Sequence, residues 1–473
     1  MISAKSIRNR IHPEELNKIR VCLLLILLAA VSANAKYSIE CYDIYGKYHF
    51  KSEYVARPAI SFGIDYLQER KQEKVVIRRP KQTGYFSGNF SRESLQHLRN
   101  WGLLPANPDS GYPVMKKPFT KILLIVLESM DLANIHAYNP GIPENTTPFL
   151  DQLSRDYLSF SHYYTASQPT SWGLNSMILS RIEYEADLML KNTSIFDLLQ
   201  KQGYQGYYLS PMNGMFADNR RIYEEQFRPQ HIFFLEELNQ MFGITGGKTW
   251  GITDNNMYYC TRQILQKIPE DQKYFVMLST IDTHPPYTES GSLENQTGLH
   301  TPFLRSLRCA DRNLQEFLEP LMQSEQFDEQ MLIIVTADHS ATHGENYLQR
   351  EEFSPDRIPL ILITRNNWLA SAYPFDPDKL CSQIDLPVTL LNLLGINAPE
   401  TFMGRNMITK KSFAYTKSPQ YLLLHLPGNR QISWILAQPA ESASPEEKAV
   451  YDFYDLYYGI EELPRDSETY NLF

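Results

Sequence analysis

Four continuous apolar segments of strand length constrain the fold of this chain more than any other feature. They are Ile122–Leu127, Phe275–Leu278, Met331–Val335 and Pro359–Ile363. Strands that are apolar at every position are typical of a parallel sheet that is covered on both faces. Helical stretches lie between them, at residues 147–157, 194–202, 304–322 and 386–394. This alternation predicts an α/β fold, with a mostly parallel central sheet flanked by helices.

The distribution of these elements divides the chain into four regions. Residues 1–35 form a leader, and residues 36–117 are rich in Tyr, Lys, Arg and Ser but carry no chemical motif. Residues 118–410 contain the alternating strands and helices and are expected to form the main domain. Short apolar runs at 421–425, 432–437 and 450–456 predict a small antiparallel C-terminal subdomain over residues 411–473.

The leader has the features of a secretory signal peptide. Four basic residues precede the apolar run Val21–Val31, and an A-x-A cleavage site follows at Ala33–Ala35. The 15 residues between Arg20 and Lys36 are fewer than the roughly 20 that span a bilayer. An uncleaved, tilted anchor and a buried core helix are the alternatives. A signal or an anchor predicts an extracytoplasmic protein that is secreted, periplasmic or held at the membrane.

The charge of the chain argues against one class of partner. Its 45 basic and 54 acidic residues give a net charge of −9, and no basic run is longer than a pair such as Arg78-Arg79 or Lys116-Lys117. A nucleic-acid-binding domain needs a basic face, so we expect no nucleic-acid partner. The sequence also contains neither a P-loop nor a G-x-G-x-x-G motif, so no nucleotide cofactor is expected.

Polar residues that could bind a metal ion or transfer a proton follow three of the four apolar segments. Glu128 follows the first, Asp282 and His284 come shortly after the second, and Asp338 and His339 follow the third. The carboxyl ends of parallel strands meet at one edge of a sheet, where α/β proteins bind their ligands. One such carboxylate is as easily a helix cap, but three strand ends together predict a shared site. Carboxylate oxygens and imidazole nitrogens suit Mn²⁺, Mg²⁺ or Zn²⁺.

Two adjacent hydroxyls supply a candidate nucleophile. Thr170 and Ser171 follow Pro169 at the start of an apolar helical stretch. Either one would cap this helix, beside unpaired backbone N–H groups and the positive end of the helix dipole. A threonine cap before an apolar stripe is also ordinary in structural helices. The residues alone therefore leave open both the choice of hydroxyl and its role.

Four motifs together resemble a known family. In chain order they are Val126–Met130, Gln168–Gly173, Thr283–Tyr287 and Thr336–His339, with supporting segments at Thr147–Asp151, Ile384–Gly395 and Gly404–Asn406. Their order and spacing resemble the sulfatase-like branch of the alkaline phosphatase superfamily. Within that branch they are most similar to the lipoteichoic acid synthases and the phosphoglycerol or phosphoethanolamine transferases. The resemblance covers about residues 118–473, whose end from Phe453 onward is similar to the closing strand and turn of sulfatases.

The resemblance implies a catalytic centre with one divalent metal ion. Its ligands would be Glu128, Thr170, Asp338 and His339, and Thr170 would also be the nucleophile. His284 would contact the transferred group and protonate the leaving alcohol.

The resemblance also implies a pair of residues that bind the substrate phosphate, Asn219 and Arg220. The preceding Ala217-Asp218 departs from the aromatic pattern of the transferases at this place. Three further polar residues are expected to have structural roles: Asp311, His343 and Glu345.

The implied function is that of a metal-dependent phosphotransferase or phosphodiesterase with a phospho-threonine intermediate. Its substrate would be a phospholipid or a glycan with a phosphorylated head group, met at a membrane surface. The first alternative is a sulfatase, in which the metal ion would be Ca²⁺. No cysteine lies between Cys41 and Cys260 to become formylglycine, which leaves Ser167, and the arginine of the sulfatase motif is absent. The second alternative is an inactive ligand-binding ectodomain, against which the intact set of implied ligands argues.

Overall fold

The computed structural model describes the main domain, with gaps, and parts of the C-terminal region. The described residues are 78–80, 119–182, 193–216, 219–244, 250–287, 298–340, 356–399, 402–408, 413–417, 421–428, 430–435, 444–450 and 460–462. The predicted leader at 1–35 lies outside them, as does the region 36–117 apart from residues 78–80. In the part of the chain that the structure describes, no helix is both long and apolar enough to cross a membrane.

A seven-stranded sheet forms the centre of the main domain. Its strands are β2 (Lys121–Leu127), β3 (Leu158–Ser159), β5 (Gln205–Leu209), β6 (His231–Phe233), β7 (Tyr274–Ser279), β8 (Met331–Ala337) and β9 (Leu360–Ile363). They are arranged in the order β3-β9-β8-β2-β7-β5-β6. β2 pairs in parallel with both β7 and β8, and β5 pairs in parallel with β6 and β7. The ends of β2, β7 and β8 therefore lie side by side.

The four apolar segments correspond to β2, β7, β8 and β9, so the predicted mostly parallel sheet is confirmed. Every residue of these four strands is buried, as uninterrupted apolar sequence requires when both faces of a sheet are covered. β9 runs antiparallel to its neighbours β3 and β8. An apolar segment records burial and not strand direction, so the sequence alone could not show this reversal.

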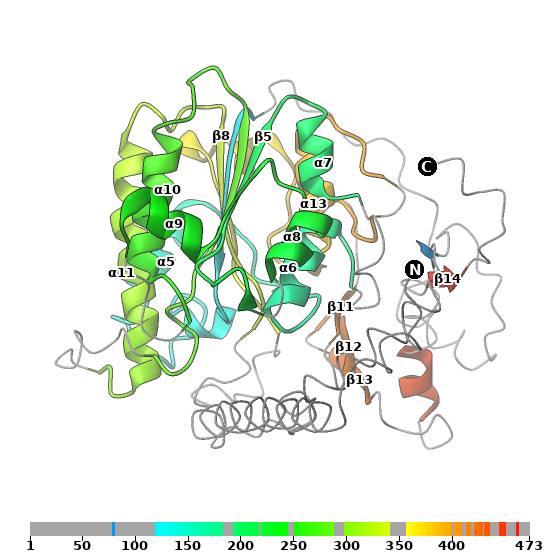
Figure 1. Ribbon diagram of the computed structural model, residues 1–473. Helices are drawn as coiled ribbons and strands as arrows, with labels where there is room; N and C mark the ends of the chain where they lie inside the picture. Colours follow the sequence, from blue (N-terminus) through cyan, green and yellow to red (C-terminus); the bar gives the residue numbers. More distant parts are fainter. Residues whose placement is uncertain are drawn as a thin grey trace, which may run out of the picture. The chain divides into compact units, whose positions relative to one another are not determined.

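Helices cover both faces of the sheet (Figure 1). α5 (Pro148–Asp156), α10 (Asp254–Leu265) and α11 (Pro302–Gln323) lie on one face, and α6 (Thr170–Leu179), α7 (Ile195–Gln200) and α13 (Asp385–Leu393) on the other. The four predicted helices correspond to α5, α7, α11 and α13. The remaining helical elements are η1 (Leu132–Asn134), α8 (Asn219–Gln226), α9 (Leu235–Phe242), η5 (Arg365–Asn367) and α12 (Trp368–Ala372).

The C-terminal region contains the predicted antiparallel sheet. Its strands are β11 (Ala414–Lys417), β12 (Tyr421–Leu426) and β13 (Arg430–Ile435). The strands expected at 421–425 and 432–437 are thus present. The strand expected from Val450 onward is wrong at its start, because residues 445–450 are helical, and residues 451–456 lie outside the described chain. Ala449 and Val450 are buried in this helix, and burial alone does not distinguish a helix from a strand.

Two pairs of short strands complete the described structure. β1 (Arg78–Pro80) pairs antiparallel with β14 (Ile460–Glu462), and β4 (Tyr163–Tyr164) pairs in parallel with β10 (Cys381–Ser382). The chain that follows β4 is also bonded to β11: Lys417 N–H donates to the Ala166 carbonyl, and Gln168 N–H donates to the Lys417 carbonyl. Backbone hydrogen bonds therefore fix this segment almost up to the first residue of α6.

Candidate active site

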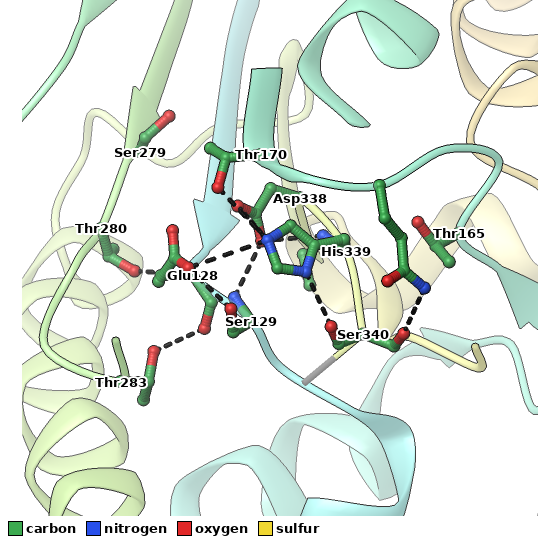
Figure 2. A network of polar contacts seen from close by, with 12 residues as sticks. Glu128, Ser129, Thr165, Thr170, Ser279, Thr280, Thr283, Asp338, His339 and Ser340 are labelled. Atoms are coloured by element: carbon green, nitrogen blue, oxygen red, sulfur yellow. Dashed lines mark hydrogen bonds and ion pairs between the residues drawn. The ribbon is translucent and has the colours of Figure 1, made fainter. Parts of the chain in front are cut away.

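Three predicted metal ligands meet at the carboxyl ends of β2 and β8. Glu128 follows β2, while Asp338 and His339 follow the neighbouring β8. All three side chains are buried, and one ligand atom from each lies within 4.8 Å of the others. His339 Nε2 is 3.8 Å from Glu128 Oε1 and 3.5 Å from Asp338 Oδ2 (Figure 2). We call these three residues the ligand cluster.

Neighbouring groups hold the two carboxylates in place. Asp338 Oδ1 accepts the backbone N–H groups of Ser129, at 2.8 Å, and of His339, at 2.7 Å. Ser129 Oγ donates to Glu128 Oε1 at 2.6 Å, and the Glu128 N–H donates to Thr280 Oγ1 at 3.0 Å. Thr280 follows β7, so side chains and backbone groups at the ends of three adjacent strands are hydrogen-bonded together (Figure 2).

Two atoms of the ligand cluster fit a cation. His339 Nδ1 donates to the Ser340 carbonyl at 2.7 Å, which places the lone pair of the neutral ring on Nε2, as in many metal-binding histidines. Asp338 Oδ2 is buried and has no hydrogen-bond partner. A buried carboxylate oxygen without a partner is costly, and a bound cation would remove that cost. The residues present therefore fit a divalent metal ion.

The electrostatics of the ligand cluster lead to the same conclusion. Burial, and then the charge of Glu128, raise the pKa of Asp338 to about 7. Burial lowers the pKa of His339, but the charges of Asp338 and Glu128 outweigh this effect and leave that pKa above its usual value. Two buried carboxylates this close repel each other when both are ionised. Positive charge between them would relieve that repulsion.

Thr170 brings a hydroxyl to the ligand cluster. It is the first residue of α6, and its Oγ1 lies 3.2 Å from His339 Nε2 (Figure 2). The expectation that Thr170 or Ser171 caps this helix is wrong, because the N-cap is Pro169, whose carbonyl accepts the N–H groups of Trp172 and Gly173. A residue needs only extended backbone and a carbonyl to take the N-cap position. The hydroxyl of Thr170 is thereby left to face the ligand cluster.

The charges of the ligand cluster act on His284. Burial lowers the pKa of His284, and the charges of His339 and Asp338 also act on it. Its Nδ1 donates to the Pro285 carbonyl at 2.7 Å, and the Trp250 indole N–H donates to the same carbonyl at 2.8 Å. The two rings are 4.7 Å apart, centroid to centroid. The shared acceptor and the ring contact fix the orientation of the imidazole.

The other two predicted site residues open α8 and have different surroundings. Asn219 is buried. Arg220 Nη2 donates to both carboxylate oxygens of Glu237 of α9, at 2.8 and 3.0 Å, and lies 3.5 Å from Glu236. It also stacks 4.7 Å above the centre of the Phe234 ring. In the described residues the structure thus joins Arg220 to α9 rather than to the ligand cluster.

Several residues near the site carried no signal in the sequence. Trp250 and Thr280 belong to no motif, yet one orients His284 and the other bonds to Glu128. Asp311 has the structural role expected of it, since its carboxylate accepts the first N–H groups of α5, from Phe149 at 3.1 Å and Leu150 at 2.8 Å. His343 and Glu345 lie outside the described residues.

Comparison with known proteins places the chain in a family. The sequence profile of the Sulfatase family matches residues 120–396, more than half of the chain. Phosphoglycerol transferase I from Salmonella agona is 24% identical over 278 residues, which are 54% of this chain and 35% of that protein. The same protein from Salmonella typhi matches to the same extent. The chain therefore spans about a third of the length of the curated relatives that it matches.

Three solved structures share the fold. The lipoteichoic acid synthase LtaP from Listeria monocytogenes superposes with a TM-score of 0.55 at 18% identity, covering 75% of this chain and 98% of that one. An alkaline phosphatase superfamily protein from Vibrio parahaemolyticus has a TM-score of 0.52 at 18% identity, with coverages of 80% and 100%. The C-terminal periplasmic domain of EcEptC from Escherichia coli has a TM-score of 0.50 at 16% identity, with coverages of 71% and 100%. The profile match shows that the chain belongs to the Sulfatase family, and the three solved structures have the same fold.

Proposed function

We propose that this protein is a metal-dependent extracytoplasmic phosphotransferase or phosphodiesterase that acts through phosphorylation of Thr170. The observation that carries the proposal is the 3.2 Å contact between Thr170 Oγ1 and His339 Nε2, at a buried cluster of two carboxylates and an imidazole. A hydroxyl beside three potential metal ligands is the arrangement that an activated oxygen nucleophile needs. The similarity to phosphoglycerol transferase I supports phosphorus chemistry at this site.

The ligand cluster and Thr170 would hold one divalent ion, Mn²⁺, Mg²⁺ or Zn²⁺. The unpartnered Asp338 Oδ2 and the lone pair of His339 Nε2 support this assignment. When bound, the ion would lower the pKa of the Thr170 hydroxyl and stabilise negative charge on the phosphoryl oxygens. Thr170 Oγ1 attacks phosphorus, a bond forms between them, and the bond from phosphorus to the first alcohol breaks.

In this proposal His284 donates a proton to the leaving alcohol. Its Nδ1 proton is held by the Pro285 carbonyl, so Nε2 would take up and deliver the catalytic proton. Burial lowers the pKa of His284, whereas a negatively charged phosphodiester beside it favours the protonated ring. A second alcohol or water then attacks the phospho-threonine, His284 takes up the proton of this nucleophile, and the bond from phosphorus to Thr170 Oγ1 breaks, which regenerates Thr170.

The substrate in this proposal is a phospholipid or a glycan with a phosphorylated head group, reached at the membrane surface. Asn219 and Arg220 are the proposed contacts of the substrate phosphate. Arg220 would exchange Glu237, its carboxylate partner, for the phosphate on binding. A guanidinium pairs with a phosphate as well as with a carboxylate, so this exchange keeps the charge of the side chain paired.

Sulfate ester hydrolysis has less support. Ser167 is the residue that would have to become formylglycine, but it is completely buried and its Oγ donates to the Ile182 carbonyl at 3.1 Å. Thr170 is the hydroxyl that contacts the ligand cluster. The convergence of Glu128, Thr170, Asp338 and His339 also favours an enzyme over an inactive binding domain.

The experiment that tests the proposal compares two neighbouring hydroxyls. Thr170→Ala is expected to lower kcat for an aryl phosphodiester by at least 10³-fold, because it removes the nucleophile. Ser171→Ala is the matched control and should keep most of the activity, since it deletes an equivalent oxygen at the same helix start. An active Thr170→Ala variant would contradict the proposal.

A further inference from the structure

Two buried glutamines connect the segment before Thr170 with the segment that carries Asp338 and His339. Gln383 is fully buried. Its Oε1 accepts the Ala166 N–H at 2.8 Å and lies 3.1 Å from the Thr165 hydroxyl, which is equally close to the Ser167 carbonyl. Its Nε2 donates to the carbonyls of Ala337, at 3.0 Å, and Asp338. The oxygen of this amide thus bonds to one segment and its nitrogen to the other.

Gln168 makes a second connection, nearer to the nucleophile. Its Nε2 donates to Ser340 Oγ at 3.0 Å and to Asp356 Oδ1 at 2.6 Å, and Ser340 Oγ also donates to Asp356 Oδ1 at 2.9 Å. Ser340 is the residue whose carbonyl fixes the His339 ring (Figure 2). Gln168 stands two positions before Thr170, so one side chain joins the start of α6 to the residue after His339.

The two segments approach each other as closely as backbone allows. A Cβ atom at Gly173 would lie 1.9 Å from the Asp338 carbonyl oxygen, so α6 packs its bare backbone against the end of β8. Besides the contact between Thr170 and His339, the glutamine amides bond to polar atoms of both segments. A shift of either segment would break several hydrogen bonds in a buried environment, which is costly.

We propose that Gln168 and Gln383 are positioning residues that fix Thr170 relative to Asp338 and His339. This inference rests on the proposed function, in which Thr170 is the nucleophile. An amide suits the task because it offers a donor and an acceptor without charge, so it bridges carbonyls and N–H groups beside two carboxylates without adding to their repulsion. Misplacing a nucleophile by about 1 Å costs on the order of 10²-fold in rate.

The test replaces each glutamine with methionine, which has similar volume but no hydrogen-bonding amide. In the full chain, Gln168→Met and Gln383→Met are each expected to lower kcat for an aryl phosphodiester by roughly 10- to 100-fold. KM should stay within about twofold, because neither side chain is assigned to substrate. The affinity for Zn²⁺ alone, measured by calorimetry, should change by less than about threefold, since the ligand cluster is intact.

Gln230→Met is the matched control. Gln230 Oε1 accepts the Gly206 N–H at 2.6 Å at the start of β5, the opposite end of the sheet from the ligand cluster. This variant also deletes a hydrogen bond between a glutamine and the backbone, but it should keep kcat. If a methionine variant does not fold, Ser340→Ala, which deletes the Gln168 acceptor, is the second variant and should lower kcat in the same direction.

Three outcomes overturn the inference. One is a kcat within twofold of the wild type in both folded methionine variants, and another is an equal loss of kcat in Gln230→Met. The third is a loss of Zn²⁺ affinity that accounts for the whole loss of kcat, because the glutamines would then act on the ligand cluster and not on Thr170. Thr170→Ala, measured alongside, separates the two proposals: if it is inactive while the methionine variants are fully active, only the positioning role fails.

Discussion

Among single residues, two buried aspartates, Asp338 and Asp385, differ in the hydrogen bonds that their carboxylate oxygens accept. Asp385 Oδ1 accepts the Arg405 N–H and its Oδ2 accepts the Ser382 N–H, each at 2.8 Å. Asp338 Oδ2 has no hydrogen-bond partner, and burial together with the charge of Glu128 raises the pKa of Asp338 to about 7. The fold provides hydrogen bonds to both oxygens of Asp385 but to only one oxygen of Asp338, which is why we propose Asp338 as the metal ligand.

Replacing each aspartate with asparagine should therefore have opposite effects. Asp338→Asn is expected to weaken Zn²⁺ binding at least 100-fold and to leave the metal-free protein as stable as before, or more stable by about 1 kcal/mol, because a repelled buried charge is removed. Asp385→Asn should keep Zn²⁺ affinity and lose about 1–3 kcal/mol of stability. Calorimetry and denaturant unfolding measure the two quantities. Wild-type Zn²⁺ affinity in Asp338→Asn would show that the metal binds elsewhere.

At the scale of secondary-structure elements, the contact between the start of α6 and the end of β8 is critical. Its glycine at position 173 lets the helix backbone touch the Asp338 carbonyl, where a Cβ would lie only 1.9 Å away. Alanine is favoured over glycine inside a helix by about 1 kcal/mol, so intrinsic helix propensity opposes the residue found here. The close packing of α6 on β8 explains why glycine is needed.

Gly173→Ala tests this contact. The helix must move away from β8, and we expect a net loss of about 1–3 kcal/mol from overpacking together with a kcat lowered by at least tenfold. Thermal unfolding and turnover of a phosphodiester are the measurements, with Ser171→Ala as a control at the same helix start. A Gly173→Ala variant that is more stable and fully active would mean that α6 tolerates displacement.

The C-terminal sheet contains a buried histidine that responds to pH. His425 in β12 stacks on Tyr164 at 4.0 Å between ring centroids. Its Nε2 donates to Thr416 Oγ1 at 3.0 Å, because the Thr416 hydroxyl proton is given to the Thr165 carbonyl. Burial, and then the charge of Arg357, lower the pKa of His425 to about 3. The His425 ring is thus neutral in the folded protein.

The sign of the pH effect follows from this lowered pKa. The unfolded chain takes up a proton on His425 near pH 6.5, while the folded chain does so only near pH 3. Stability from this group is complete above about pH 6.5 and falls with decreasing pH, by about 1.4 kcal/mol per pH unit. In His425→Phe, which keeps the ring contact, the slope of unfolding free energy between pH 6.5 and 4.5 should be smaller by this amount. Equal slopes in both proteins would place the acid sensitivity in other groups.

For the whole molecule, uninterrupted apolar sequence made the central strands predictable, and the polar residues directly after them made the ligand cluster predictable. β5 and β6 were missed, because Gln205–Leu209 begins with Gln and Gly and His231–Phe233 has only three residues. The linking glutamines were missed for a different reason. Gln168 and Ser340 are 172 positions apart, and Ala166 and Gln383 are 217 apart, and no local pattern encodes such pairs. Likewise, the glutamates that hold Arg220 belong to another helix.

The central claim is that Thr170 becomes covalently phosphorylated, and peptide mapping by mass spectrometry tests it most directly. The full chain, loaded with Zn²⁺ or Mn²⁺, is incubated with phosphatidylglycerol, phosphatidylethanolamine or an aryl sulfate and quenched in acid. We predict that a phosphate-linked head group is found on Thr170 in the wild type and in Ser171→Ala with one of the two lipids, and is absent in Thr170→Ala. An adduct on another residue, or an aldehyde at position 167 with turnover of the aryl sulfate, would contradict the account.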